Sequence, residues 1–345
     1  MFEKLIQKFS KDIALDLGSS TIRILERDKG IVVDAPTVVS INNRTDQIIA
    51  VGQEAKEMVG KNPPYITTYK PLVRGVISDY EITEKMLRYF FGRIHEMSGS
   101  LIPRPRVIVG VPLETTEVER KAVEDVILGS GAREVIMVED IMAAAVGARL
   151  PVEEPVGSMI VDIGGGKAEM AVVSLSGIVH WKSVANAGDE MNRAIIMYCK
   201  DVFNILLGEV QAEHVKIQLG SAVPLGTPLQ VSVRGRDIIS GLPKEFMMND
   251  GHVREAIERI VQDIMRAIKE TIESTPPELV ADIHERGIIV CGGGALLRGI
   301  DALITAETDI AVRVIDDPLS TAVRGLGSLF ESPEPLKTIR IPSNR

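Results

Sequence analysis

The chain has 345 residues, more than one ordinary hydrophobic core accommodates, so its length predicts two domains with insertions. Hydrophobic residues make up 45% of the chain and charged residues 25%, a balance that excludes an intrinsically disordered protein. The formal net charge of −9 argues against a general nucleic-acid-binding protein, although a local basic patch stays possible.

The two cysteines, Cys199 and Cys291, lie far apart in the sequence and form neither a metal-binding spacing nor a disulfide framework. No apolar run is long enough to span a bilayer. The N-terminus also lacks the apolar core and cleavage site of a signal peptide. We therefore expect a protein of the reducing cytoplasm.

Residues 1–11 predict a short amphipathic helix, because their bulky apolar side chains recur at the spacing of one helix face. Such a helix can lie on a membrane surface or dock on the protein's own core. Its place before the first core strand favours the membrane, since chain ends are usually loosely held. The apolar residues are Phe2, Leu5, Ile6 and Phe9.

Residues 12–33 predict two strands around a glycine loop, then a hairpin turn into a third strand. The proline-bearing stretch 34–77 is interpreted as an inserted small subdomain. Further along, a loop of polar residues and prolines carries Leu101 and Ile102. This apolar pair is either buried or a second point of membrane contact.

The following segments alternate strands and helices, which predicts an α/β sheet. The expected helices of the first half are 81–97, 116–128 and 142–147, and its further strands are 107–111 and 134–138. For the second half we expect helices at 191–207, 209–219, 253–274 and 317–329, strands at 231–236 and 287–291, and a loose tail from residue 332.

The second half opens with an apolar run that ends in Asp162, followed by three glycines and Lys167. Glycines let a backbone approach a ligand closely, and successive N–H groups in such a turn attract anions. A carboxylate at a strand end can hold a hydrated divalent cation. The stretch is therefore either a phosphate-and-magnesium loop or a tight hairpin with an exposed aspartate.

Residues 13–32 repeat the pattern of residues 159–179 almost position for position. The duplication favours the phosphate loop and predicts two similar domains with a nucleotide in the cleft between them. The aligned positions include Asp16 with Asp162 and Gly18 with Gly164.

Two further features of the second half are a charged residue pair and a third glycine run. Glu213 and Lys216 lie three residues apart on one helix face, where the ordinary interpretation is a surface ion pair of small energetic value. A third glycine run, 292–294, follows a strand and precedes a helix expected from residue 295. That arrangement forms an anion or nucleotide site.

With these motifs in hand, the chain resembles the MreB family of bacterial actins. Its three glycine regions match the phosphate-1, phosphate-2 and adenosine motifs of the actin and sugar-kinase superfold, and the likeness covers essentially the whole chain. It implies an α/β, actin-like ATPase fold of two duplicated domains with a nucleotide cleft between them. The longest matching stretches are 75–87, 118–135, 142–166, 275–287 and 291–301.

The resemblance implies four subdomains behind the N-terminal helix of residues 1–11. Subdomain IA would take residues 12–33, 78–145 and 315–345, and subdomain IB residues 34–77. Subdomain IIA would take residues 146–182 and 246–314, and subdomain IIB residues 183–245.

The resemblance also implies ATP or ADP with Mg²⁺ as cofactors. Asp16 and Asp162 would hold the metal through water, while Glu213 and Lys216 would touch the ribose and adenine. The residues implied to contact the nucleotide are Gly18, Ser19, Ser20, Thr21, Gly164, Gly165, Gly166, Lys167, Glu213, Lys216, Gly293, Gly294, Ala295 and Leu296.

Members of the family assemble with themselves into paired protofilaments on the inner face of the cytoplasmic membrane. There they guide cell-wall synthesis and set cell shape. The implied partners are a second copy of the chain, the membrane, and membrane proteins of the elongation machinery such as RodZ and MreC, with no nucleic acid.

Two positions depart from the family's hydrolysis site. Asp140, which follows Glu139, stands where the family has a water-orienting glutamate that is one methylene longer. Lys167 stands where a threonine hydroxyl helps to position the attacking water, and a charged lysine cannot accept its proton. We hypothesise that the protein binds ATP and polymerises but hydrolyses ATP slowly or not at all. Neutral drift with compensation elsewhere is the alternative.

Three other functions compete. A sugar kinase of the same superfold would need a substrate pocket, for which the sequence offers no large insertion. A chaperone-type ATPase would carry an extra substrate-binding domain. An actin-like filament for motility, or for organelle or plasmid positioning, would share the fold and the nucleotide, and it stays open.

Overall fold

The computed structural model describes residues 11–98 and 104–342, which divide into two compact units. The first unit takes residues 1–156, 173–179 and 319–345, and the second takes residues 157–172 and 180–318. The predicted membrane residues Phe2, Leu5, Ile6, Phe9, Leu101 and Ile102 lie outside the described residues.

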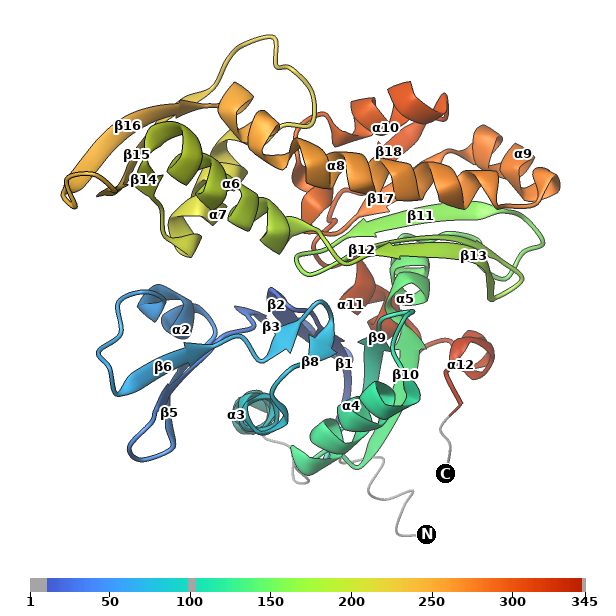
Figure 1. Cartoon of the computed structure of the whole chain (residues 1–345). Coiled ribbons are helices and arrows are strands. Elements are labelled where there is room, and N and C mark those ends of the chain that lie inside the picture. The colour runs from blue at the N-terminus through green and yellow to red at the C-terminus, as the bar shows by residue number, and fades with distance from the viewer. Residues whose placement is uncertain (1–10, 99–103, 343–345) are drawn as a thin grey trace. The chain divides into compact units, whose positions relative to one another are not determined.

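The first unit is built on a five-stranded sheet in the order β10-β9-β1-β2-β3 (Figure 1). Strands β1, β2 and β3 are joined as antiparallel neighbours, while β9 and β10 run parallel to β1. The strands are β1 (Asp12–Leu17), β2 (Thr21–Glu26), β3 (Gly30–Pro36), β9 (Arg106–Val111) and β10 (Glu134–Glu139).

The insertion after β3 forms a small sheet in the order β5-β4-β6 and a short two-stranded ribbon. Its elements are β4 (Val39–Asn42), β5 (Gln47–Val51), α2 (Gln53–Met58), β6 (Ile66–Tyr69), β7 (Leu72–Val73) and β8 (Val76–Ile77). The helices of the first unit are α3 (Tyr80–Ser98), α4 (Glu117–Gly129), α5 (Asp140–Gly147), α11 (Thr321–Ser328) and α12 (Pro333–Ile339).

The second half carries a five-stranded sheet in the order β13-β12-β11-β17-β18, the same sequence of neighbours as in the first sheet. The predicted duplication of the two domains is thereby confirmed at the level of topology. These strands are β11 (Ser158–Ile163), β12 (Ala168–Ser174), β13 (Gly177–Val184), β17 (Ile288–Cys291) and β18 (Val312–Val314).

A second, three-stranded sheet of this unit consists of β14 (Ile205–Leu206), β15 (Gln230–Asp237) and β16 (Pro243–Asn249). The helical elements are α6 (Gly188–Phe203), α7 (Glu209–Leu219), α8 (Asp250–Glu273), α9 (Pro277–Arg286), the 3₁₀ turn η1 (Gly293–Leu296) and α10 (Ile300–Thr308).

Helix α8 shows why the sequence folds as it does. Val253, Ile257, Ile264 and Ile268 recur at helical spacing and are all fully buried in the core of the second unit. Burying each such side chain stabilises the fold by about 2 kcal/mol. The helix begins at a capping box, in which the Asn249 side chain accepts a hydrogen bond from the His252 N–H.

Helix α5, which begins at Asp140, is held by close packing against α11. A Cβ atom added at Gly147 would overlap the carbonyl oxygen of Thr321, and one added at Gly325 would overlap that of Ala143. The two helices therefore approach each other at backbone distance. This contact holds in place the helix that Asp140 begins.

Several expected bounds were wrong. The tail as far as residue 342 is not loose: α12 continues the chain, Ile341 is buried, and its N–H donates to the Met137 carbonyl. The last long helix was expected from residue 317 but begins at Thr321. After the third glycine run, the expected helix from residue 295 is the 3₁₀ turn η1, and α10 starts at Ile300. Strand β16 was not predicted.

Helix α4 offers a direct test of local stability. Its N-cap, Thr116, accepts a hydrogen bond from the Glu119 N–H, while the Glu119 carboxylate accepts one from the Thr116 N–H. Thr116→Ala should lower the free energy of unfolding by about 1 kcal/mol. Thr116→Ser keeps the cap and should melt like the wild type in a thermal denaturation experiment. Equal losses in both variants would show that the methyl group, not the cap, matters.

Candidate functional site

The first glycine loop connects β1 to β2. A Cβ atom at Gly18 would lie 2.6 Å from the carbonyl oxygen of Thr21, so only glycine fits this turn. The insertion holds the loop in place: Thr37 Oγ1 donates to the Gly18 carbonyl over 2.7 Å, and the Gly75 N–H donates to Ser19 Oγ over 2.6 Å. Thr37 and Gly75 were not predicted as loop anchors, because both lie outside the three glycine motifs.

Asp16 lies at the carboxyl end of β1, beside this loop. In the antiparallel pair with β2 it stands opposite Arg23, whose guanidinium is 3.9 Å from the Asp16 carboxylate. Arg23 also pairs with Asp34 at 3.1 Å. The carboxylate of Asp16 is partly exposed and keeps its position at the strand end, as the sequence predicted.

The second glycine loop connects β11 to β12 and is closed by a hydrogen bond of 2.9 Å from the Gly164 N–H to the Lys167 carbonyl. Its carbonyl groups are held by the N-terminus of α6. The Gly188 N–H donates to the Gly164 carbonyl over 3.2 Å, and the Asp189 N–H donates to the Gly165 carbonyl over 2.8 Å. The loop is therefore built on a rigid support.

Lys167 forms an ion pair that the sequence analysis missed. Its Nζ lies 2.8 Å from the carboxylate of Glu169, which is 2% exposed. The two residues are separated by one position in extended chain, so their side chains leave the backbone on the same side. This alternation of side chains along an extended segment could have predicted the ion pair from the sequence. The charge of Lys167 is thus shared with a buried carboxylate.

The third glycine run packs directly against the second loop's strand. Gly292 has φ +79°, and a Cβ atom there would overlap the Asp162 carboxylate and lie 2.5 Å from the Ile163 carbonyl oxygen. A Cβ atom at Gly294 would overlap the Ile163 side chain. The strands β11 and β17 are parallel neighbours with Asp162 opposite Cys291, which brings these motifs together.

Helix α7 also contacts the residues that support the second glycine loop. Lys216 Nζ donates a hydrogen bond of 2.7 Å to the Gly188 carbonyl, next to the second glycine loop. Glu213 lies one turn earlier on this helix and is half-buried. In the turn η1, Ala295 is buried and Leu296 is 57% exposed. The second unit therefore gathers Asp162, the second loop, Lys216 and the third glycine run into one network.

In the first unit, Glu139 and Asp140 stand at the start of α5. Burial raises the pKa of Glu139, and the nearby Asp140 carboxylate adds to this rise, while Arg120 opposes it. A Cβ atom at Gly110 on β9 would overlap the Asp140 carboxylate, so Gly110 provides the room in which that carboxylate sits.

Among residues 11–98 and 104–342, no cluster of three or more histidine, cysteine, aspartate or glutamate side chains is placed to bind a metal directly. Within the same residues, no helix combines the length and apolar character that a membrane crossing requires. Asp16 and Asp162 belong to different units.

The chain was compared with known proteins. The family model described as MreB/Mbl protein matches residues 10–338. Cell shape-determining protein MreB of Escherichia coli strain K12 is 43% identical over 335 residues, which cover 96% of each chain. Cell shape-determining protein Mbl of Bacillus subtilis strain 168 is 39% identical over 328 residues, which cover 95% of this chain and 98% of Mbl.

Solved structures agree with these relatives. MreB5 of Spiroplasma citri bound to ADP superposes with a TM-score of 0.89 at 35% identity, covering 94% of this chain and 97% of that one. The structure of the same protein bound to AMPPNP also gives a TM-score of 0.89, at 34% identity. The fold is therefore actin-like, and the chain belongs to the MreB/Mbl family of bacterial actins.

Proposed function

We propose that the chain is an ATP-binding bacterial actin that polymerises into paired protofilaments and organises cell shape through the cell-wall synthesis machinery. One observation carries this proposal: two sheets of the same strand order each present a glycine loop between their equivalent strands, β1 and β2 in one and β11 and β12 in the other. The names of its E. coli and B. subtilis relatives, which describe cell shape determination, support the role.

In this proposal the two loops hold the phosphates and the third glycine run backs the adenosine, with ADP and ATP as ligands. The MreB5 structures with ADP and AMPPNP support this assignment. The glycines fit the role, because a side chain at Gly18, Gly292 or Gly294 would overlap the surrounding groups. Asp16 and Asp162 would hold Mg²⁺ through water, and the cation would neutralise phosphate charge.

Lys216 gives a test of the nucleotide site. Because its ammonium group sits beside the second glycine loop, Lys216→Ala should weaken ATP binding by about tenfold, the loss of roughly one charge-assisted contact. Lys200→Ala on the neighbouring helix α6 removes the same charge from an exposed position and should bind ATP like the wild type. Titration with a fluorescent ATP analogue measures both affinities, and equal affinities would exclude Lys216 from the site.

We further propose that hydrolysis is slow or absent. Asp140 carries a shorter side chain than the family's glutamate, and Lys167 offers no hydroxyl group to the water. The ion pair to Glu169 adds to this argument, since it holds the Lys167 ammonium group at a buried carboxylate. With Glu139, these residues form the weakened hydrolysis site of the proposal.

The four subdomain boundaries and the membrane attachment belong to this proposal as well. The amphipathic residues before Lys11, and the pair Leu101 and Ile102, would contact the inner face of the cytoplasmic membrane. RodZ and MreC are the proposed partners there.

The experiment that tests the function is electron microscopy and sedimentation of the protein with ATP on liposomes, with and without residues 1–10. We expect paired filaments on the lipid for the full chain, and filaments that stay off the lipid for the truncated one. Assembly without any lipid binding would favour a filament for motility or positioning. Absence of ATP-dependent assembly in both proteins would refute the proposal and favour an enzyme of the same superfold.

A further inference from the structure

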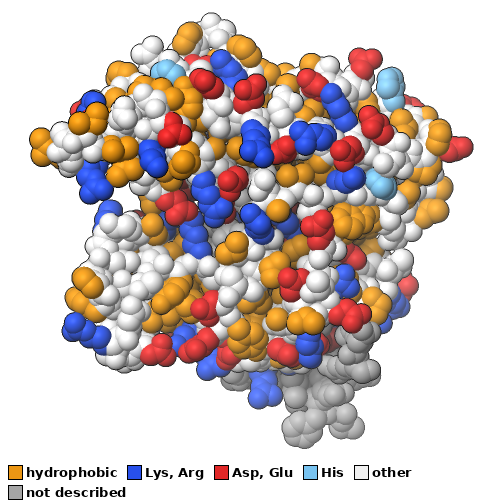
Figure 2. Space-filling view, viewed as in Figure 1, with side chains coloured by type: hydrophobic (Ala, Val, Ile, Leu, Met, Phe, Trp, Pro, Cys, Tyr) orange, Lys and Arg blue, Asp and Glu red, His pale blue; other side chains and the backbone are white. Residues whose placement is uncertain are grey.

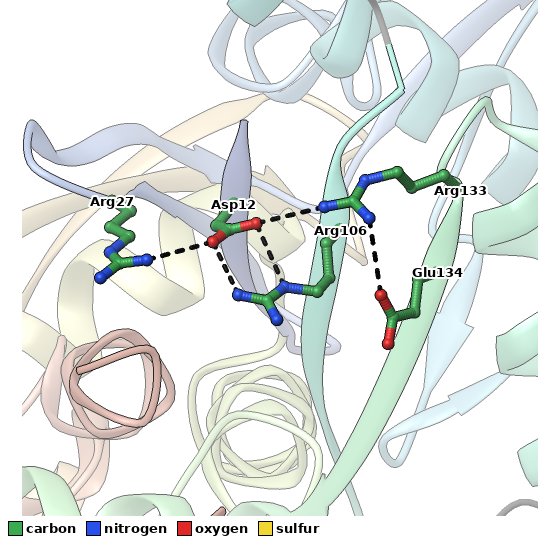
Figure 3. Close-up of polar contacts among 5 residues, drawn as sticks. All are labelled: Asp12, Arg27, Arg106, Arg133 and Glu134. Carbon is green, nitrogen blue, oxygen red and sulfur yellow. Dashed lines mark hydrogen bonds and ion pairs between the residues drawn. The ribbon is translucent and has the colours of Figure 1, made fainter. Parts of the chain in front are cut away.

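Three arginines surround one aspartate at the start of the first unit's sheet (Figure 3). Arg106 grips the Asp12 carboxylate with two hydrogen bonds of 3.1 and 2.7 Å. Arg27 lies 3.4 Å and Arg133 3.6 Å from the same carboxylate, and Arg133 also pairs with Glu134 at 3.7 Å. The residues come from neighbouring strands, since Asp12 and Glu134 both stand opposite Arg106 in the sheet.

A second carboxylate extends this cluster. Glu26, at the end of β2, is 1% exposed and pairs with Lys11 at 3.0 Å and with Lys29 at 3.1 Å. The two inner carboxylates are covered, with Asp12 at 14% exposure, whereas Lys11, Arg27 and Lys29 are about 40% exposed. Lys11, Arg27 and Lys29 therefore present positive charge to the solvent above two covered carboxylates, while Arg106 and Arg133 are 27% and 17% exposed and Glu134 is 45% exposed.

The charge balance of this basic cluster runs against that of the chain. Its ion pairs join five cations, Lys11, Arg27, Lys29, Arg106 and Arg133, to three carboxylates. Asp28 in the hairpin turn and the exposed Arg104 offset each other. The whole chain has a net charge of −9, and on the face seen in Figure 2 acidic and basic side chains are interspersed.

The chain also enters the fold at this cluster. Lys11 directly follows residues 1–10, and Arg104 directly follows residues 99–103. The Arg106 N–H donates to the Lys11 carbonyl over 3.0 Å, so Lys11 lies beside the start of β9, two residues after Arg104. Both segments with predicted membrane-contacting residues are therefore connected to the fold at this end of the sheet.

We propose that the basic cluster binds the phosphate headgroups of an anionic phospholipid bilayer. Arginine suits this partner because its planar fork donates two hydrogen bonds to phosphate oxygens. Anionic leaflets attract basic side chains within about 10 Å at moderate salt. The cluster lies at the opposite end of β1 from the first glycine loop, about 20 Å away by strand rise, so it is separate from the nucleotide site.

This inference rests on the proposed membrane attachment and adds to it a choice of lipid. The apolar residues supply affinity for any bilayer, whereas the cluster selects anionic headgroups and opposes the repulsion of a chain that is negative overall. Each cation that is lost should weaken binding by roughly fivefold, and raised salt should weaken it too.

The test is sedimentation of the full chain with vesicles of phosphatidylcholine alone or mixed with phosphatidylglycerol. The variant is Arg27→Gln with Lys29→Gln, because Asp12 then keeps Arg106 and Glu26 keeps Lys11. The control is Arg193→Gln with Arg266→Gln, two exposed arginines of the second unit that also pair with carboxylates. Melting temperature and ATP-dependent assembly without lipid show that each variant is folded.

We expect the wild type and the control to prefer the phosphatidylglycerol vesicles, and the cluster variant to lose binding to them by more than about tenfold, with unchanged binding to phosphatidylcholine. Equal wild-type binding to both vesicles, or equal losses in variant and control, overturns the lipid choice and leaves membrane attachment standing. If the wild type binds neither vesicle, membrane attachment fails as well. The lipid preference and salt dependence of the wild type test the choice of lipid even if a variant misfolds, and the comparison of variant with control tests the cluster.

Discussion

Replacing Lys167 by threonine together with Asp140 by glutamate should raise phosphate release from polymerised protein by on the order of a hundredfold. The size follows from geometry, since a displacement of about 1 Å at a reacting group can cost that factor. Glutamate at position 140 extends the carboxylate by one methylene from the start of α5. Threonine at position 167 adds a hydroxyl group and removes the ammonium group that pairs with Glu169.

The control for this pair is Lys167→Arg, which keeps a cation within reach of Glu169 and should release phosphate at the wild-type rate. Lys167→Thr removes an ion pair from a buried carboxylate, so the melting temperature of each variant is measured beside the rate. Turnover by the wild type as fast as that of the double variant would contradict slow hydrolysis. A slow double variant with normal ATP binding would place the defect at other residues.

The sequence predicted the duplication of the two domains. The apolar runs around Asp16 and Asp162 are alike because each forms the antiparallel start of an equivalent sheet, and the structure confirms the duplicated strand order. Helix α8 was expected because apolar residues recur at helical spacing along most of its 24 residues. Such features depend on local periodicity, which a single amino-acid sequence shows directly.

Features that depend on tertiary partners were missed. The tail from residue 332 contains three prolines and was expected to be loose, yet Ile341 is buried and its N–H donates to the Met137 carbonyl of β10. Strand β16 follows an exposed turn, and pairing with β15 defines it more than its own residues do. Propensity gives no account of a contact between segments that are far apart in the chain.

The candidate site likewise combines residues that a local motif marks with residues that only tertiary contacts bring in. The glycines and aspartates could be proposed from the sequence because their chemistry is visible in a short motif, whereas the groups that hold the loops could not. Thr37 and Gly75 anchor the first loop from the insertion, and neither belongs to one of the three glycine motifs. Glu169 could have been found, because it alternates with Lys167 along an extended segment.

Gly292→Ala should unfold the second unit more readily than any other single change that we propose, and should abolish ATP binding. Alanine at φ +79° is strained by about 1 kcal/mol. Its methyl group would also overlap the Asp162 carboxylate and lie 2.5 Å from the Ile163 carbonyl oxygen, and overpacking of this kind costs about 3 kcal/mol. Together these effects should lower the melting temperature by about 10 °C.

The matched control is Gly226→Ala in the same unit, where an added methyl group meets no heavy atom within 4 Å. It should melt within about 2 °C of the wild type, since surface substitutions of this kind change stability little. Thermal denaturation with and without ATP separates the two effects, because a bound ligand raises the melting temperature of a protein that still binds it. If Gly292→Ala melts like Gly226→Ala and is stabilised by ATP, then the close packing of the third glycine run on Asp162 does not form the nucleotide site.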